Sequence, residues 1–104
     1  GAPQSNIHEG PKYLAFLRDR YFSDGALSEV DRLAFSWAAY NAGPAKVRRM
    51  RELAKELGRD PNRWFGHVEV AAGKIVGRET VKYVDDIYKY FIAYRLIADL
   101  DSDG

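Results

Sequence analysis

The sequence predicts an all-α fold, an irregular bundle of about five helices. Apolar residues recur at the three- and four-residue spacing of a helix, and no segment of useful length alternates apolar and polar residues as a strand does. Glycine and proline signals divide the chain into helix-sized segments, chiefly at Gly43-Pro44 and at Gly58. No internal repeat is present, which argues against a repetitive architecture.

The first helix is expected to begin near Asn6 and to run to about Phe22. Leu14, Leu17 and Tyr21 would share its apolar face. Pro11 either begins this helix or bends it, because a proline beyond the first turn removes a backbone hydrogen bond.

A second helix is predicted over about residues 29–41. Ser28 and Asp31 have the spacing of a capping box, and the apolar face would consist of Val30, Leu33, Ala34, Trp37 and Ala38. Gly43 can adopt the left-handed conformation that ends a helix, and Pro44 suits the first turn of the next one. Tyr40 and Asn41 would therefore lie in the last turn, at a rigid corner.

Three further helices are predicted over about residues 45–57, 68–72 and 80–98. The last is apolar on more than one side, so we expect it in the middle of the bundle, with Tyr90 and Tyr94 in the core. The third helix would point Val47, Met50, Leu53, Ala54 and Leu57 inward. Its expected outward face is strongly charged and comprises Arg48, Arg49, Arg51, Glu52, Lys55 and Glu56.

The composition is that of one globular domain at most. Of the 104 residues, 46% are hydrophobic and 30% are charged, and neither value fits a disordered or membrane class. The net charge of +1 argues against a general nucleic-acid binder, although residues 44–63 hold seven Lys or Arg and three acids. Cysteine is absent, which excludes thiolate chemistry.

No apolar run in the sequence is long enough to span a membrane, and no export signal is seen.

Four stretches of the sequence form an ordered set of motifs. They are Asn6-Ile7 with Gly10 and Tyr13-Leu14; Ala39-Tyr40-Asn41-Ala42-Gly43-Pro44; Asp60-Pro61-Asn62-Arg63-Trp64-Phe65; and Arg78-Glu79-Thr80 with Tyr83-Val84. In order and spacing they resemble the lytic transglycosylases that cleave bacterial peptidoglycan, the family with the goose-type-lysozyme-like domain. The resemblance covers roughly residues 6–95 and implies a lysozyme-like fold, here a partial lobe.

One departure from the family pattern concerns the catalytic acid. The family's acid is a glutamate in a Glu-Ser pair, followed by Gly-Leu-Met-Gln, and both motifs precede the helix that here begins near Asn6. In this sequence no Glu is followed by Ser, the only Met is Met50 and the only Gln is Gln4. The resemblance thus implies the C-terminal part of a catalytic domain, inactive alone although the parent protein would be an enzyme.

The resemblance also implies the chemistry of the site. One glutamate acts as acid and then as base, and the 6-hydroxyl of the sugar attacks to leave a 1,6-anhydromuramoyl end. Tyr40 would assist near that glutamate, and Asn41 would hold the sugar's acetamido group or the local backbone. Together with Ala42 and Tyr83 they are our expected substrate-binding residues. The alternative is structural: a tyrosine packed at a helix end and an asparagine that satisfies the last carbonyls.

Several other residues are weaker candidates for a catalytic or binding role. Glu79 opens the last helix, where the dipole favours an ionised carboxylate, so we reject it as a general acid. Tyr83 either contacts a sugar with its ring or belongs to a core stripe. His8 and His67 are too few for a metal site, and we expect neither a metal nor a cofactor. Asp99, Asp101, Asp103 and Gly104 match the opening of a calcium loop, but an acidic frayed tail is the preferred interpretation.

The expected organisation is a lead-in at residues 1–5, a helical domain at residues 6–98 and an acidic tail at residues 99–104. The predicted partner is peptidoglycan, with no nucleic acid and no membrane span, in the periplasm or cell envelope as the resemblance implies. Two alternatives stay open: a non-enzymatic peptidoglycan-binding module, and a helical module that uses the basic third helix to contact protein or nucleic acid.

Overall fold

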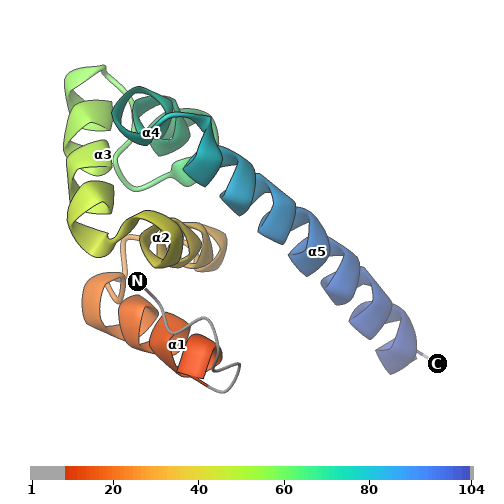
Figure 1. The fold of residues 1–104 in the computed structure, drawn as a ribbon. Coiled ribbons are helices and arrows are strands. Elements are labelled where there is room, and N and C mark those ends of the chain that lie inside the picture. Colours follow the sequence, from red (N-terminus) through yellow and green to blue (C-terminus); the bar gives the residue numbers. More distant parts are fainter. Residues whose placement is uncertain (1–8, 104) are drawn as a thin grey trace.

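The computed structural model describes residues 9–103, which form helices joined by short turns (Figure 1). The helices are α1 (Glu9–Tyr21), α2 (Glu29–Ala42), α3 (Pro44–Glu56), α4 (Glu69–Val76) and α5 (Arg78–Asp103), with a kinked π-helical turn, η1 (Trp64–Val68), before α4. No strand occurs between residues 9 and 103. The predicted all-α class and the number of helices are therefore confirmed.

Both ends of α2 are built as the sequence predicts. The Ser28 hydroxyl accepts a hydrogen bond from the Asp31 amide at 3.1 Å and donates one to the Asp31 carboxylate at 2.7 Å. The other carboxylate oxygen of Asp31 accepts from the Trp64 amide at 2.9 Å, which ties η1 to the start of α2. At the far end, Gly43 has a φ of 95° and Pro44 opens α3, so the chain turns sharply after Ala42.

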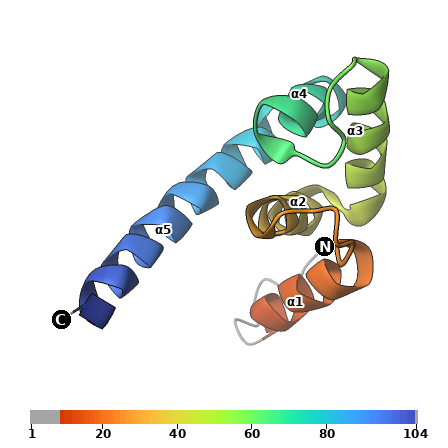
Figure 2. The same ribbon diagram turned by 180° about the vertical axis from the view of Figure 1, so that it is seen from behind.

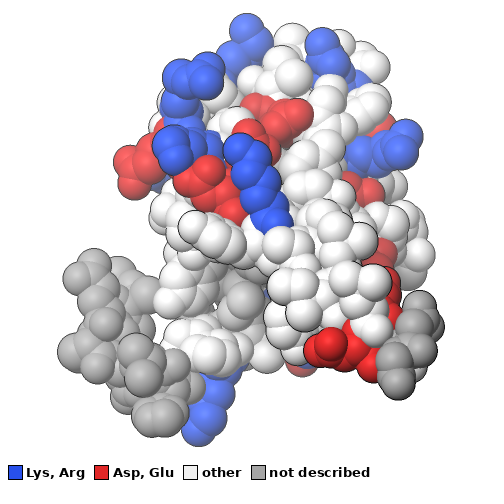
Figure 3. Space-filling model, turned by 90° about the vertical axis from the view of Figure 1, so that its right-hand side faces the viewer, with Lys and Arg blue, Asp and Glu red and all other residues white. Residues whose placement is uncertain are grey.

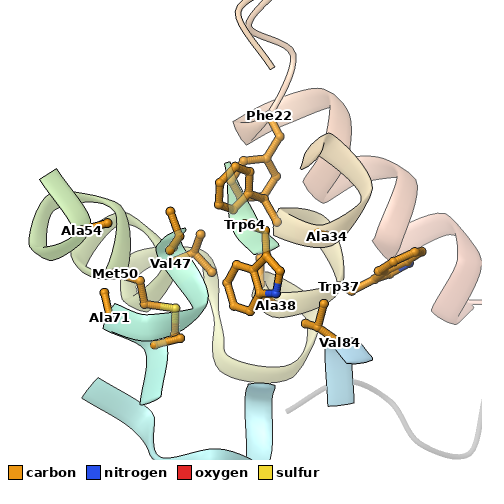
Figure 4. Close-up of a cluster of buried hydrophobic side chains, with 14 of the residues drawn as sticks. Phe22, Ala34, Trp37, Ala38, Val47, Met50, Ala54, Trp64, Ala71 and Val84 are labelled. Carbon is orange, nitrogen blue, oxygen red and sulfur yellow. The ribbon is translucent and has the colours of Figure 1, made fainter. Parts of the chain in front are cut away.

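The centre of the bundle is α2. Residues 34–39 of this helix are all buried, and α1, α3, α5 and η1 pack against it. Trp64 is fully buried among side chains from α2, α3 and α4, as Figure 4 shows. A helix covered on most sides needs apolar residues around its circumference. Ser36, the buried polar residue of α2, satisfies its hydroxyl by donating to the Arg32 carbonyl at 2.7 Å.

The prediction that the last helix lies in the middle of the bundle is wrong. The first half of α5 packs against α2 and α4, and Arg95 in the second half lies 3.7 Å from the Glu29 carboxylate of α2. The helix then extends beyond the other elements (Figures 1 and 2). Tyr90 and Tyr94, expected in the core, are 77% and 71% exposed. The projecting helix raises the radius of gyration to 14.3 Å, above the roughly 13 Å typical of a compact chain of about 100 residues.

The projecting half of α5 exposes several large apolar side chains and continues to Asp103. On the side toward which it projects, Figure 3 shows a broad band of uncharged residues between charges gathered above and below. Because Asp99 and Asp101 belong to the helix, residues 99–103 form neither the frayed tail nor the loop that the aspartate spacing suggested. The exposed large apolar side chains of this half are Ile92, Tyr94, Leu96, Ile97 and Leu100.

Two details of α3 and the segment after it also differ from prediction. Leu57, expected to point inward, is 44% exposed because it lies just past the last residue of α3. The short helix predicted at residues 68–72 is longer, Glu69–Val76, since Gly73 stays helical and Gly77 ends the segment with a φ of 76°. Before it, Gly66 also has a positive φ, which allows the chain to kink inside η1.

Candidate functional site

Tyr40 lies in the last turn of α2, half-buried between helices. Its ring is tilted against that of Tyr13 on α1, with 5.8 Å between ring centroids. Its hydroxyl rests against the first turn of α1, where a Cβ added to Gly10 would come within 3.2 Å of the Tyr40 oxygen. Any residue larger than glycine at position 10 would therefore crowd this hydroxyl. The contact fixes where Tyr40 presents its one polar atom.

Asn41 connects α2 to the start of α5. Its side-chain oxygen accepts a hydrogen bond from the Thr80 hydroxyl at 2.6 Å. Thr80 is 3% exposed, whereas Asn41 itself is exposed. The bond thus satisfies a buried hydroxyl, and the amide group of Asn41 has no side-chain partner among residues 9–103. In the structural alternative the Asn41 amide group would donate to the last carbonyls of its own helix, and the bond that its oxygen accepts from Thr80 is compatible with either role.

Tyr83 lies one turn after Thr80 on α5, close enough to Tyr40 for their hydroxyls to interact electrostatically. Burial raises the pKa of Tyr83, and the nearby Tyr40 raises this pKa further. The Tyr83 hydroxyl is therefore protonated at neutral pH and can act as a hydrogen-bond donor. Tyr83 is half-buried, so it belongs neither wholly to the core nor wholly to the surface.

The structure thus brings together the residues that the sequence singled out. Tyr40, Asn41 and Ala42 come from the end of α2, and Tyr83 reaches the same corner from α5. The corner offers aromatic rings, hydroxyl groups and a carboxamide, which are groups that bind neutral polar ligands. Aromatic rings stack on the apolar faces of such ligands while hydroxyl and amide groups bond their polar substituents.

Sequence reasoning assigned no role to three residues that build this corner. Gly10 receives the Tyr40 hydroxyl, Tyr13 packs against the Tyr40 ring, and Thr80 bonds Asn41. All three occur in the stretches that resemble the family, so the resemblance could have pointed to them as site residues. What the sequence could not supply was the pairing between positions far apart along the chain.

The remaining candidates lie elsewhere or have structural partners. Glu79 is exposed in the first turn of α5, as predicted for a dipole-favoured acid. His67 accepts a hydrogen bond at Nδ1 from the Asp60 amide at 3.0 Å, so it closes the turn before η1. His8 lies outside the described residues. Within residues 9–103, no group of three His, Asp or Glu residues is placed to hold a metal ion.

The Transglycosylase SLT domain family matches residues 2–62, which include Tyr40, Asn41 and Ala42. This chain belongs to the SLT transglycosylase family. Its relatives include proteins named membrane-bound lytic murein transglycosylase F. The one from Desulfosudis oleivorans is 36% identical over 101 residues, covering 85% of this chain and 22% of the relative. That from Pseudomonas fluorescens strain Pf-5 is 30% identical over 102 residues, covering 86% and 21% respectively.

The chain therefore spans about a fifth of the length of these curated relatives. No solved structure matches it. The SLT match ends at residue 62, before α5, so the place of Tyr83 beside Tyr40 rests on the packing of α5 against α2. Among the described helices none is both long and apolar enough to cross a membrane.

Proposed function

We propose that this SLT chain is part of a lytic murein transglycosylase domain, in which the corner at the end of α2 binds the MurNAc-GlcNAc strands of peptidoglycan. The observation that carries the proposal is the joining of three helices at the family's Ala-Tyr-Asn motif. Tyr40 rests on Gly10 of α1, and Asn41 bonds Thr80 of α5. These contacts position half-buried Tyr40 and exposed Asn41 side by side, as substrate-positioning groups must be.

Each residue of the corner has a proposed role. Tyr40 hydrogen-bonds near the reacting centre and assists catalysis, while Asn41 uses its side-chain amide group to hold the acetamido group of the sugar. Tyr83 lays its ring against a sugar and donates from its protonated hydroxyl. Ala42 contributes a small side chain beside Asn41, which leaves room for the strand.

Bond cleavage requires a proton donor that this sequence does not supply. In the family's reaction a glutamic acid protonates the leaving oxygen as the glycosidic bond breaks. The 6-hydroxyl of the muramoyl sugar then attacks its own anomeric carbon and gives up its proton to the same glutamate. No Glu in this chain stands in the Glu-Ser motif. We therefore propose that these 104 residues bind the glycan and do not cleave it on their own.

The proposed location follows from the proposed substrate. Two relatives are named membrane-bound lytic murein transglycosylases. Murein is the material of the bacterial cell wall, so we propose that the protein acts in the periplasm or cell envelope.

The test is cosedimentation with purified insoluble peptidoglycan, followed by mass spectrometry of the supernatant. The proposal predicts that the chain sediments with peptidoglycan and releases no 1,6-anhydromuramoyl products. Failure to sediment would contradict the binding role. Release of anhydromuramoyl products that is abolished by Glu79→Gln would show that Glu79 had been wrongly rejected as the acid.

A further inference from the structure

A second candidate site lies at a cavity of about 320 Å³ that involves none of the residues of the Tyr40 corner. It opens between the end of α1, one side of α3 and the turn before η1. This volume is at the small end of the range found for ligand pockets, about 300 to 1,000 Å³. The lining residues are Tyr21, Phe22, Pro44, Arg48, Arg51, Glu52, Lys55, Pro61 and Asn62.

Arg51 is the central feature of this cavity, and its position differs from prediction. The sequence placed it on the solvent-exposed face of α3, but it is half-buried. Its Nε donates to the Pro61 carbonyl at 2.9 Å, and one terminal nitrogen, Nη2, donates to the Asn62 side-chain oxygen at 2.8 Å. The guanidinium also lies 4.9 Å from the centre of the Phe35 ring. These contacts hold it in a fixed orientation.

The charge of Arg51 has no carboxylate partner within salt-bridge distance in the described part of the chain. Asp24 is near enough to raise the pKa of Arg51, against the larger lowering that burial causes. The Nη1 group makes no hydrogen bond to residues 9–103. A fixed guanidinium with unused donors is suited to bind an anion in two-point geometry.

The other lining residues specify the kind of anion. Arg48 and Lys55 add two exposed cations at the rim, while Glu52 places one carboxylate among them. The Asn62 oxygen is used by Arg51, which leaves its amide group as a donor. Aromatic and proline side chains supply the apolar part of the wall. A polyanion would need a continuous basic surface, which Glu52 and the net charge of +1 do not provide.

From this arrangement we infer that the cavity binds the carboxylate of a short acidic peptide, whose methyl and methylene groups pack against the apolar wall. The carboxylate is bound by Arg51, with Arg48 and Lys55 adding attraction at the rim. A bare inorganic anion would leave the apolar wall without a partner. The inference does not depend on glycan binding at the Tyr40 corner, because the two sites share no residue.

The experiment is an NMR titration of the isotope-labelled chain at low salt, with N-acetyl-alanyl-glutamate as its C-terminal amide for the probe, so that the side-chain carboxylate is its single charge. N-acetyl-alanyl-glutamine, also as its C-terminal amide, is the neutral control, and inorganic phosphate tests for a bare anion. We expect saturable chemical-shift changes at Arg51 and Asn62 with the acidic dipeptide. The dissociation constant of the neutral dipeptide should be at least about tenfold higher. Equal binding of the two dipeptides, absence of saturable shifts, or tighter binding of phosphate would overturn the inference.

Surface variants of α3 provide matched controls that should not affect folding, since all four positions are exposed. Arg48→Gln and Lys55→Gln should each weaken binding about two- to fivefold, and Glu52→Gln should strengthen it by a similar factor. Arg49→Gln removes a charge from the same helix at a position that does not line the cavity, so its affinity should match wild type. If Arg49→Gln weakens binding as much as Arg48→Gln, the attraction is a general charge effect and the site is rejected.

Discussion

The two halves of α5 contain the same kinds of residue and have different surroundings. In residues 78–91, Thr80 and Val84 are buried and Tyr88 packs against Phe65 with 4.5 Å between ring centroids. In the outer half, residues 92–102 are all exposed although they include Tyr94, Ile97 and Leu100. Apolar spacing thus identifies a face of a helix but does not reveal whether another element covers it. Exposed apolar surfaces of this kind are typical of contacts with other protein segments.

The boundary between the halves is the contact of Phe91 with Trp37 of α2. The two rings meet edge to face at 5.8 Å between centroids, and Trp37 is 6% exposed. Trp37→Ala should lower the free energy of unfolding by about 3 to 5 kcal/mol, because it leaves a large cavity between α2 and α5. Chemical denaturation measures this loss. A loss below about 1 kcal/mol would mean that α5 is not packed on α2 as described.

Tyr88 and Tyr94 give the most direct comparison of the two halves, since they are the same residue on the same helix. Tyr88→Ala should cost about 1 to 2 kcal/mol of unfolding free energy, as a partly buried ring is removed. Tyr94→Ala should change it by no more than about 0.5 kcal/mol. The measurement is the denaturation midpoint of each variant. Equal losses would show that the outer half of α5 is covered in solution.

The hydrogen bond between Asn41 and Thr80 contributes less to stability than the packing of the inner half of α5, residues 78–91. Thr80→Val removes the hydroxyl but keeps the shape of the side chain, and Asn41→Ala removes the acceptor. A double-mutant cycle on stability should give a coupling energy of about 1 kcal/mol, the usual net value of one hydrogen bond. A coupling near zero would remove the evidence that Asn41 holds the start of α5.

The smallest expected effect is a pH dependence from Tyr83. Its pKa is raised above the ordinary value of 10.0 by burial and by Tyr40, so the folded state favours the protonated hydroxyl. The resulting stabilisation is fully present below about pH 10 and is lost as the pH rises through the folded-state pKa. Tyr83→Phe should therefore lose less stability than wild type between about pH 8 and pH 11. The control Tyr94→Phe, at a ring that is 71% exposed, should follow wild type.

Local features of the fold could be predicted from sequence because they depend on neighbouring residues. The Ser28 cap, the glycine stop at Gly43 and the apolar face of α2 all follow from residues within one or two turns. The central position of α2 could not be predicted in this way. It depends on four elements packing on one helix, and the sequence pattern of α5 is also apolar on more than one side.

The same distinction applies to the candidate site. The motif around Tyr40 and Asn41 was visible because its residues are adjacent in the sequence. Their partners Gly10 and Thr80 are about thirty to forty residues away, and only the packing of α1 and α5 on α2 brings them together. Arg51 was misassigned for a similar reason, as helical spacing cannot show that residues 61–62 fold back over it.

We propose that the corner formed by Tyr40, Asn41, Ala42 and Tyr83 binds glycan. The most direct test is an NMR titration with a tetrasaccharide of alternating GlcNAc and MurNAc. Saturable shifts should concentrate on these four residues, and Tyr40→Phe should weaken binding about three- to tenfold through the loss of one hydrogen bond. The matched variant Tyr94→Phe should bind as wild type. Shifts confined to other surfaces, or unchanged affinity in Tyr40→Phe, would contradict the claim.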